Sequence, residues 1–404
     1  MIVASLNKKT AKKFIPYGRP CLDASDIHAV VKVLKSPWLT QGAEIERFEE
    51  AFARYCDVPF AVAVSSGTAA LHLANLALGV KETDEVITSP LTFAATANSV
   101  LYCGGTPRFA DIEPSSLGLD KEKVRRALGN KTKGIIPVHF GGQPCDLFSK
   151  NDFSSRDDFF VLEDACHALG AEEKVNGAWR KIGSCHSSDA AAFSFHAVKH
   201  MTTGEGGMVT TRRKDVYEKL KILRTHGIEK NNERFLDRGQ VSNPWYYEMQ
   251  ALGFNYRLTD IQCALGTSQL KRLDDFVEKR RGVAAFYDKQ FKNTKFVKTP
   301  AQIEGRRHSY HLYVLRIDFK SLKISRAQVI RYLAQNGVGT QVHYVPVVQQ
   351  PYYKKRYGSN IDNFPACKSY YDEALSIPIF PAMSMRDAAK VTGLIKGLCL
   401  RKKR

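Results

Sequence analysis

Residues 61–78 read AVAVSSGTAALHLANLAL. The first four are small or β-branched apolar residues, which is typical of a short buried strand. The Ala- and Leu-rich residues 69–78 favour a helix, and Ser65-Ser66-Gly67-Thr68 form the turn between the two elements. A strand followed at once by a helix is the building unit of parallel sheets, so this segment predicts an α/β fold.

The same alternation continues on both sides of this unit, from about residue 25 to residue 260. We expect strands at 61–64, 85–88, 105–110, 134–138, 157–163, 190–195 and 207–211, and helices at 26–34, 44–55 and 69–78. Strands that alternate with helices predict a mixed, mainly parallel sheet with helices on both faces.

Beyond about residue 260 the pattern changes to longer helices. We expect helices at 260–273, 277–291, 325–336 and 386–400, and strands at 310–317 and 338–343. These elements predict three parts of the chain: a basic N-terminal segment (1–14), a large domain (15–265) and a smaller C-terminal α/β domain (266–404).

The composition is typical of a soluble globular protein, with 44% hydrophobic and 25% charged residues. The sequence contains no run of about 18 apolar residues that could span a membrane, and its start lacks the apolar core of a secretion signal. The nine cysteines show no C-x-x-C spacing. This argues against a zinc site or a disulfide framework and indicates a reducing compartment, so we expect a cytoplasmic protein.

The chain is strongly basic, with 60 Lys and Arg against 41 Asp and Glu and a net charge of +19. Such a charge suits nucleic acid, an acidic membrane or anionic small molecules, and does not choose among them by itself. Both ends of the chain are rich in Lys and Arg, and we interpret them as solvated ends. We expect anionic small molecules as partners, and neither nucleic acid nor a membrane.

The turn Ser65-Ser66-Gly67-Thr68 is a candidate phosphate site. Backbone N–H groups at a helix N-terminus point outward, hydroxyls flank them, and the glycine lets an anion approach. The sequence contains neither G-x-x-x-x-G-K-[ST] nor G-x-G-x-x-G, so neither a P-loop nor a dinucleotide site is indicated. The alternative is an ordinary helix cap, because Ser and Thr are preferred at that position.

Two further polar side chains follow strands. Asp164 comes after the predicted strand 157–163, which contains the apolar run 159–162, at the end of the sheet where ligands bind. A carboxylate there can pair with a protonated ring nitrogen, or can simply form a turn. Lys199 lies in a turn before the glycine-rich residues 202–207. A lysine in a partly apolar pocket has a lowered pKa and can form a Schiff base, the alternative being an ordinary surface lysine.

The spacing of His196 and His200 also fits a pair of metal ligands. No Glu follows His196 as in H-E-x-x-H, so we expect no metal site. A phosphate cup, a strand-end Asp and a strand-end Lys are together what pyridoxal 5'-phosphate requires. Phe93 follows another predicted strand and could stack on the ring of this cofactor.

Six segments extend this pattern along nearly the whole chain: SSGTAALHLA, SPLTFAATANSV, PVHFGGQPCD, LEDACHALGA, FSFHAVKHMTTGEGG and GFNYRLTDIQCALG. Through them the sequence resembles the sugar aminotransferases of the DegT/DnrJ/EryC1/StrS family. The resemblance implies fold type I of the pyridoxal phosphate-dependent transferases and a homodimer with shared active sites. PWYYEMQALGFNYRLTDIQCALG and SFHAVKHMTTGEGG look most like the branch that aminates C4 of a UDP-linked 4-keto-6-deoxy-N-acetylhexosamine in pseudaminic acid biosynthesis.

The resemblance also implies roles for individual residues. Lys199 would bind pyridoxal 5'-phosphate covalently and act as the catalytic base and acid, and Asp164 would pair with the ring nitrogen. The other cofactor contacts would come from Ser66, Gly67, Thr68 and Ser194 at the phosphate, Asn255 of the neighbouring subunit at the same phosphate, Phe93 on the ring face, and His167 near the phenolic oxygen. Candidates for the substrate pocket are Arg257, His311, Tyr313, His343 and Tyr344, with Arg307 and His308 as further candidates for the diphosphate.

The implied reaction takes the amino group from L-glutamate and gives it to the sugar ketone at one site, with ping-pong kinetics. One alternative is the same transamination on another nucleotide-linked 4-keto-6-deoxyhexose. A second is the pyridoxamine-dependent sugar dehydratases of the family, which have a His where this chain has Lys199. A third is a DNA-binding regulator on the same fold, but the basic start is too short for a helix-turn-helix domain.

Overall fold

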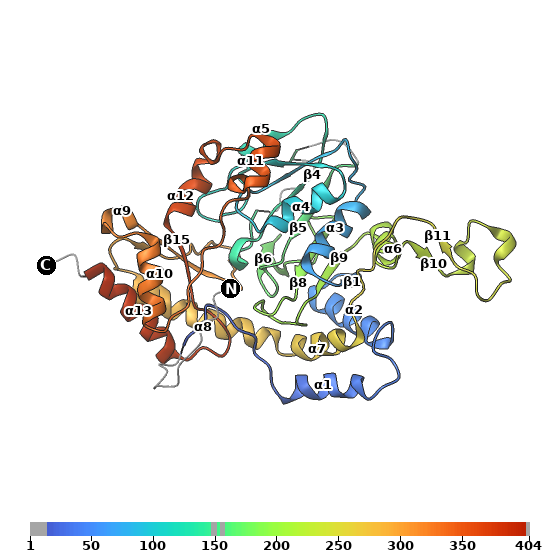
Figure 1. Cartoon of the computed structure of the whole chain (residues 1–404), viewed down its shortest axis with the longest axis horizontal. Coiled ribbons are helices and arrows are strands. Elements are labelled where there is room, and N and C mark those ends of the chain that lie inside the picture. The colour runs from blue at the N-terminus through green and yellow to red at the C-terminus, as the bar shows by residue number, and fades with distance from the viewer. Residues whose placement is uncertain (1–13, 147–151, 154–157, 401–404) are drawn as a thin grey trace.

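The computed structural model of the chain describes residues 14–146, 152–153 and 158–400 (Figure 1). The basic residues 1–13 and 401–404 lie outside the described residues. Two main sheets organise the rest: a seven-stranded sheet in the N-terminal two thirds and a three-stranded sheet in the C-terminal third. The α/β class predicted from the sequence is confirmed.

The large sheet has the strand order β1 (Phe60–Val64), β9 (Gly207–Thr211), β8 (Ala190–Ser194), β5 (Phe160–Asp164), β4 (Thr132–Ile136), β2 (Glu85–Thr88) and β3 (Thr106–Phe109). Strand β9 runs antiparallel to both of its neighbours, and the other adjacent pairs are parallel. The carboxyl ends of the parallel strands therefore meet at one edge, which is where open α/β sheets bind ligands.

Helices cover both faces of this sheet, and the alternation of side chains along β1 shows how. Ala61 and Ala63 pack with α2 (Ala43–Cys56) and α7 (Asp260–Leu270) in one buried cluster. Val62 and Val64 face the opposite way, toward α3 (Gly67–Ala77) and α6 (Lys214–Leu223). Successive side chains of a strand point to opposite faces, so a strand that is apolar at every position is buried on both sides.

The C-terminal third forms a smaller layer of its own. Its antiparallel sheet has the order β12 (Val297–Lys298), β14 (Tyr313–Ile317) and β15 (Ala374–Ile377). The helices packed with it are α8 (Leu273–Phe291), α10 (Arg326–Gln335) and α13 (Met385–Leu400). Ile15 is buried in this same core, so the first described residues pack with the C-terminal unit although they precede the large sheet in sequence.

The strand expected at 338–343 is wrong. Val338 forms an isolated bridge with Ile15, and Gln341 forms one with Ser376. Because these two partners belong to different segments of the chain, residues 338–343 do not pair continuously with either. The remaining helices and strands are α1 (Ala24–Leu34), α4 (Ala94–Tyr102), α5 (Lys121–Ala127), β6 (Glu172–Val175), β7 (Ala178–Lys181), β13 (Arg306–Arg307), α9 (Phe319–Leu322), α11 (Pro351–Tyr357) and α12 (Pro365–Glu373).

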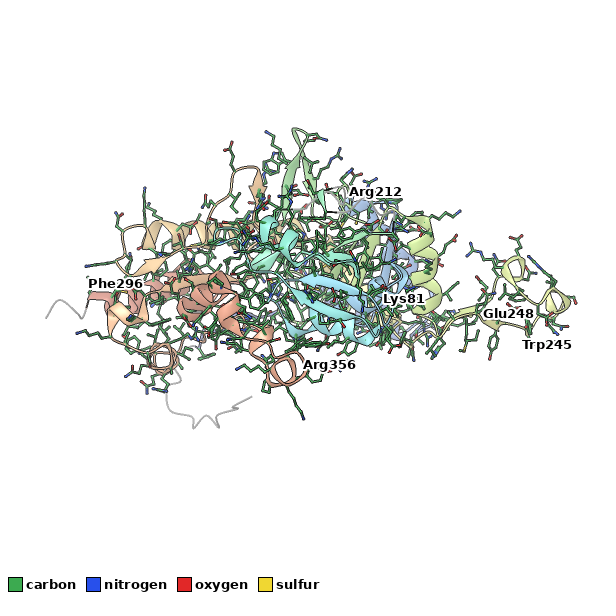
Figure 2. All side chains as sticks on the ribbon, turned by 90° about the horizontal axis from the view of Figure 1, so that it is seen from above. Lys81, Arg212, Trp245, Glu248, Phe296 and Arg356 are labelled. Carbon is green, nitrogen blue, oxygen red and sulfur yellow. The ribbon has the colours of Figure 1, made fainter. Side chains whose placement is uncertain are left out.

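An arm formed by residues 228–252 projects from the large unit beyond α6 (Figure 1). Its base is the antiparallel pair β10 (Ile228–Glu229) and β11 (Glu248–Met249). Trp245 lies at the far end of the arm (Figure 2) and is 75% exposed. In the part of the chain that the structure describes, no helix combines the length and apolarity needed to cross a membrane.

Candidate active site

A cavity of about 720 Å³ opens at the carboxyl edge of the large sheet. Its walls combine segments that follow β1, β2, β5 and β8 with residues of the C-terminal unit. The lining includes Tyr17, Ser66, Gly67, Thr68, Phe93, Thr96, Asp164, Cys166, His167, Ser194, Lys199, His311, His343 and Tyr344. The sheet topology thus brings most of the residues predicted from the sequence into one place.

The turn after β1 forms a cup with Ser194 at the end of β8. The Ser66 side chain caps α3 by accepting a hydrogen bond from the Ala69 backbone N–H at 3.1 Å. The N–H groups of the first turn have no acceptor within their own helix. A Cβ atom on Gly67 would lie 2.8 Å from the Ser194 Cβ, so only glycine keeps this cup open. The cup fits a phosphate group.

Asp164 is fixed at the last position of β5. Its Oδ2 accepts a hydrogen bond from the Thr96 hydroxyl at 2.6 Å, and its Oδ1 accepts one from the Cys166 backbone N–H at 3.1 Å. The carboxylate is buried yet lines the cavity. An oriented carboxylate of this kind can hold a proton on a ring nitrogen.

Lys199 lies in the turn that joins β8 to β9. Its backbone N–H donates to the His196 carbonyl at 2.9 Å, and this bond closes the turn. Burial lowers the pKa of the Lys199 amine from its usual 10.5, although nearby Cys166 and Asp164 partly oppose the shift. A lysine with a lowered pKa supplies more of the free amine that attacks carbonyl groups.

Four buried histidines form a cluster at the cavity: His167, His311 and His343 line it, and His200 packs against His311 with ring centroids 5.7 Å apart. Burial is the main reason that the pKa of each is lowered, to about 4 for His343 and well below 6.5 for the others. The cluster is therefore neutral at pH 7. The Nδ1 atom of His311 is buried without a hydrogen-bond partner in the described residues, which is what a site made for a ligand would leave.

Several residues expected at the site lie elsewhere within this chain. Tyr313 is buried in the C-terminal core, where its hydroxyl donates to Asp288 at 2.5 Å, so it does not line the cavity. Asn255 is exposed and does not line this cavity, and Arg257 lines a different cavity. His308 and Arg307 line a third cavity that shares no lining residue with the active-site candidate.

Sequence reasoning missed several residues that line the site, among them Thr96, Cys166 and Tyr17. Thr96 could have been found, because it lies one turn after Phe93 on a helix that starts at the edge of the sheet. Cys166 follows Asp164 closely and forms part of the cavity wall. Tyr17 carried no local signal, since long-range pairings place it at the cavity: Ile15 bridges to Val338, and the Tyr17 carbonyl accepts from the Ile379 N–H at 3.1 Å.

A family model described as the DegT/DnrJ/EryC1/StrS aminotransferase family matches residues 20–396. The chain belongs to this family. Among curated relatives it is 40% identical to the spore coat polysaccharide biosynthesis protein SpsC of Bacillus subtilis, over 95% of this chain and 97% of the relative. It is 39% identical to the UDP-4-amino-4,6-dideoxy-N-acetyl-beta-L-altrosamine transaminase of Campylobacter jejuni, over 93% of this chain and 94% of the relative.

Solved structures agree with this assignment. PseC of Helicobacter pylori is an aminotransferase of pseudaminic acid biosynthesis. It superposes with a TM-score of 0.85 at 30% identity, over 96% of this chain and 99% of the PseC chain. Spr1654 of Streptococcus pneumoniae, solved in its pyridoxamine phosphate form, superposes with a TM-score of 0.86 at 28% identity, over 96% of this chain and 99% of its own. The pyridoxal phosphate form of Spr1654 matches equally well in coverage.

The protein is therefore a pyridoxal phosphate-dependent aminotransferase of fold type I, as the sequence predicted. The residues present fit the cofactor: a cup that a Cβ on Gly67 would fill, a fixed carboxylate at Asp164 and an amine with a lowered pKa at Lys199. Phe93 is 58% exposed at the start of α4, where it lines the cavity and is available to cover a ring.

Proposed function

We propose that the protein transfers the amino group of L-glutamate to the C4 ketone of a UDP-linked 4-keto-6-deoxy-N-acetylhexosamine. The observation that carries this proposal is the match over almost the full length to a transaminase named for a UDP-linked amino sugar of this kind. The similarity to PseC supports a place in pseudaminic acid-type biosynthesis.

The side chains divide the chemical work of the reaction. When bound, pyridoxal phosphate withdraws electrons from the carbon whose proton is removed. Lys199 would take that proton and return it, since its amine faces the cavity with a lowered pKa. Asp164, held by Thr96, would keep the ring nitrogen protonated, and the Ser66–Thr68 cup with Ser194 would hold the phosphate.

We also propose that the active unit is a homodimer with shared sites. Among the described residues that line the cavity, Lys199 is the only Lys or Arg. One amine that is used in catalysis cannot also neutralise a cofactor phosphate and a nucleotide diphosphate. The missing cations would come from a second copy, which fits the expected role of Asn255 across the interface.

Features outside the cavity support this arrangement. The buried Nε of Arg257 has no hydrogen-bond partner among the described residues. Its cavity of about 680 Å³ also contains Lys230, together with Lys221 and Arg234, which pair with Glu49 and Glu218 at 3.7 and 3.1 Å. On the projecting arm Leu236 is 78% exposed and Trp245 is 75% exposed, and a second copy would remove these side chains from water.

A second substrate assignment is favoured by one observation. The 40% identity to SpsC, named for spore coat polysaccharide biosynthesis, supports amination of another nucleotide-linked keto sugar. The chemistry at Lys199 and Asp164 would be the same, and only the pocket for the sugar and its nucleotide would differ.

Substrate screening separates these assignments. Purified protein is incubated with glutamate and UDP-, GDP- or dTDP-linked 4-keto-6-deoxy sugars, and the amino sugar and 2-oxoglutarate are measured by mass spectrometry. We expect amination of the UDP-linked N-acetylhexosamine, and none with Lys199→Ala. Amination of only the GDP- or dTDP-linked sugars would support the alternative, and no glutamate-dependent amination of any of them would contradict both.

A further inference from the structure

Both ring nitrogens of His167 are engaged by groups of this chain. The backbone N–H of Gly141 donates to the His167 Nδ1 at 3.3 Å. The Nε2 atom lies 3.0 Å from the Tyr344 hydroxyl. His167 therefore links the turn after β4 to the segment of the C-terminal unit that enters the cavity.

The first of these contacts fixes the tautomer of the ring. An N–H donor at Nδ1 requires a lone pair there, so a neutral ring carries its proton on Nε2. Burial lowers the pKa of His167 well below 6.5, so the ring is neutral at pH 7. The Nε2–H group then donates to the Tyr344 oxygen, and the hydroxyl proton of Tyr344 is left to face another acceptor.

Tyr344 is placed to use that proton inside the cavity. It lines the cavity next to Phe93, with ring centroids 5.7 Å apart. In the described residues its hydroxyl makes no hydrogen bond other than the one to His167. Burial raises the pKa of Tyr344, so the hydroxyl remains protonated at neutral pH.

We propose that Tyr344 donates a hydrogen bond to the phenolic oxygen of the bound cofactor, and that His167 is the positioning residue that directs the Tyr344 proton toward it. The family resemblance places His167 near this oxygen, but here both nitrogens of the ring are already used. The Tyr344 hydroxyl is the neighbouring group with a proton to give. The inference rests on the cofactor and the role of Lys199, and it does not depend on which sugar is the substrate.

The proposal predicts a spectroscopic change that requires no sugar. A donor at the phenolic oxygen stabilises its negative charge, which favours the unprotonated form of the linkage between Lys199 and the cofactor. Tyr344→Phe should therefore raise the pKa of that linkage by about one unit, the size of a hydrogen bond to a charged group. The pKa is measured by titrating the absorbance of the bound cofactor against pH.

His167 variants separate positioning from a general structural role. His167→Leu should raise the same pKa, and His167→Gln, which retains a donor at its end, should restore it at least in part. In the double variant of Tyr344→Phe and His167→Leu, the pKa shift should equal that of Tyr344→Phe alone, because both changes remove the same hydrogen bond to the cofactor.

Tyr353→Phe is the matched control. Its hydroxyl donates to Asn98 at 2.7 Å and it does not line the cavity, so the titration should be unchanged. An unchanged pKa in Tyr344→Phe with cofactor bound would overturn the proposal, as would fully additive shifts in the double variant. Failure of the cofactor to bind the unaltered protein would instead contradict the proposed function.

Discussion

At the scale of single residues, burial changes the chemistry of Lys199. Taking the amine out of water disfavours its charged form, and Asp164 and Cys166 do not fully reverse this effect. The free amine is therefore available at a lower pH than in an exposed lysine. Burial also lowers the pKa of the surrounding histidines, so these rings are neutral and supply no positive charge to an anionic ligand.

This pKa shift predicts how fast the cofactor-free protein reacts with pyridoxal phosphate. The rate should rise with pH as Lys199 loses its proton and should level off below the usual lysine pKa of 10.5. Stopped-flow absorbance measures the rate, with Nα-acetyl-lysine as the reference amine. A rate that keeps climbing through 10.5, as for the reference, would contradict the lowered pKa.

Gly67 gives a second prediction at this scale. In Gly67→Ala the new Cβ would meet the Ser194 Cβ at 2.8 Å, so the phosphate cup would narrow. We expect retention of pyridoxal phosphate to weaken at least about tenfold, which corresponds to ~1.4 kcal/mol. Equilibrium dialysis measures it. The control is Gly282→Ala in α8, where the added methyl meets nothing within 4 Å and retention should not change.

At the scale of elements, a buried polar network ties β4 to β5 beneath the site. The His139 Nε2 donates to Glu163 at 2.9 Å, and Glu163 also accepts from the Ser188 hydroxyl. The His139 Nδ1 accepts from the Cys145 backbone N–H at 3.1 Å. Because Nδ1 accepts this bond, the neutral ring carries its proton on Nε2, the atom that donates to Glu163.

Breaking this network should destabilise the protein strongly. His139→Leu removes the donor to one Glu163 oxygen and leaves Ser188 as the donor to the other, which costs about 1–3 kcal/mol. We therefore expect a clear fall in Tm in His139→Leu. The control is His28→Leu at an exposed position, where Tm should fall only slightly. An equally small fall in the Tm of His139→Leu would contradict this role.

Local patterns predicted most of the elements in the large unit, because strand and helix periodicity there coincide with burial. The α3 cap at Ser66 and the strand-end positions of Asp164 and Lys199 follow from the same local signals. The features that local patterns did not predict depend on pairings between residues far apart in the sequence. The segment after Val338 was expected to be a strand, but it pairs with Ile15 and Ser376 separately and delivers Tyr344 to the cavity.

At the scale of the whole molecule, the single chain encloses the site but supplies few cations to it. The cavity is shared between the large sheet and the C-terminal unit, and neither Asn255 nor Arg257 lines it. A symmetric dimer would bring these two residues of one copy to the cavity of the other, because each copy then offers what the other lacks.

Mixed dimers test this arrangement. Lys199→Ala and Asn255→Ala, each defective alone, should regain activity when the two proteins are unfolded and refolded together. One site of each mixed dimer would then contain both native residues, so about a quarter of the normal activity is expected from random pairing. Lack of recovery, with mixed dimers shown by native mass spectrometry, would contradict the shared site.

The central claim is that the Lys199 amine bonds covalently to pyridoxal phosphate. Borohydride reduction of the yellow protein, followed by peptide mass spectrometry, tests it directly. We expect the phosphopyridoxyl mass on the peptide that contains Lys199, and no such adduct in Lys199→Ala. An adduct at another lysine, or no adduct after incubation with excess pyridoxal phosphate, would contradict the account.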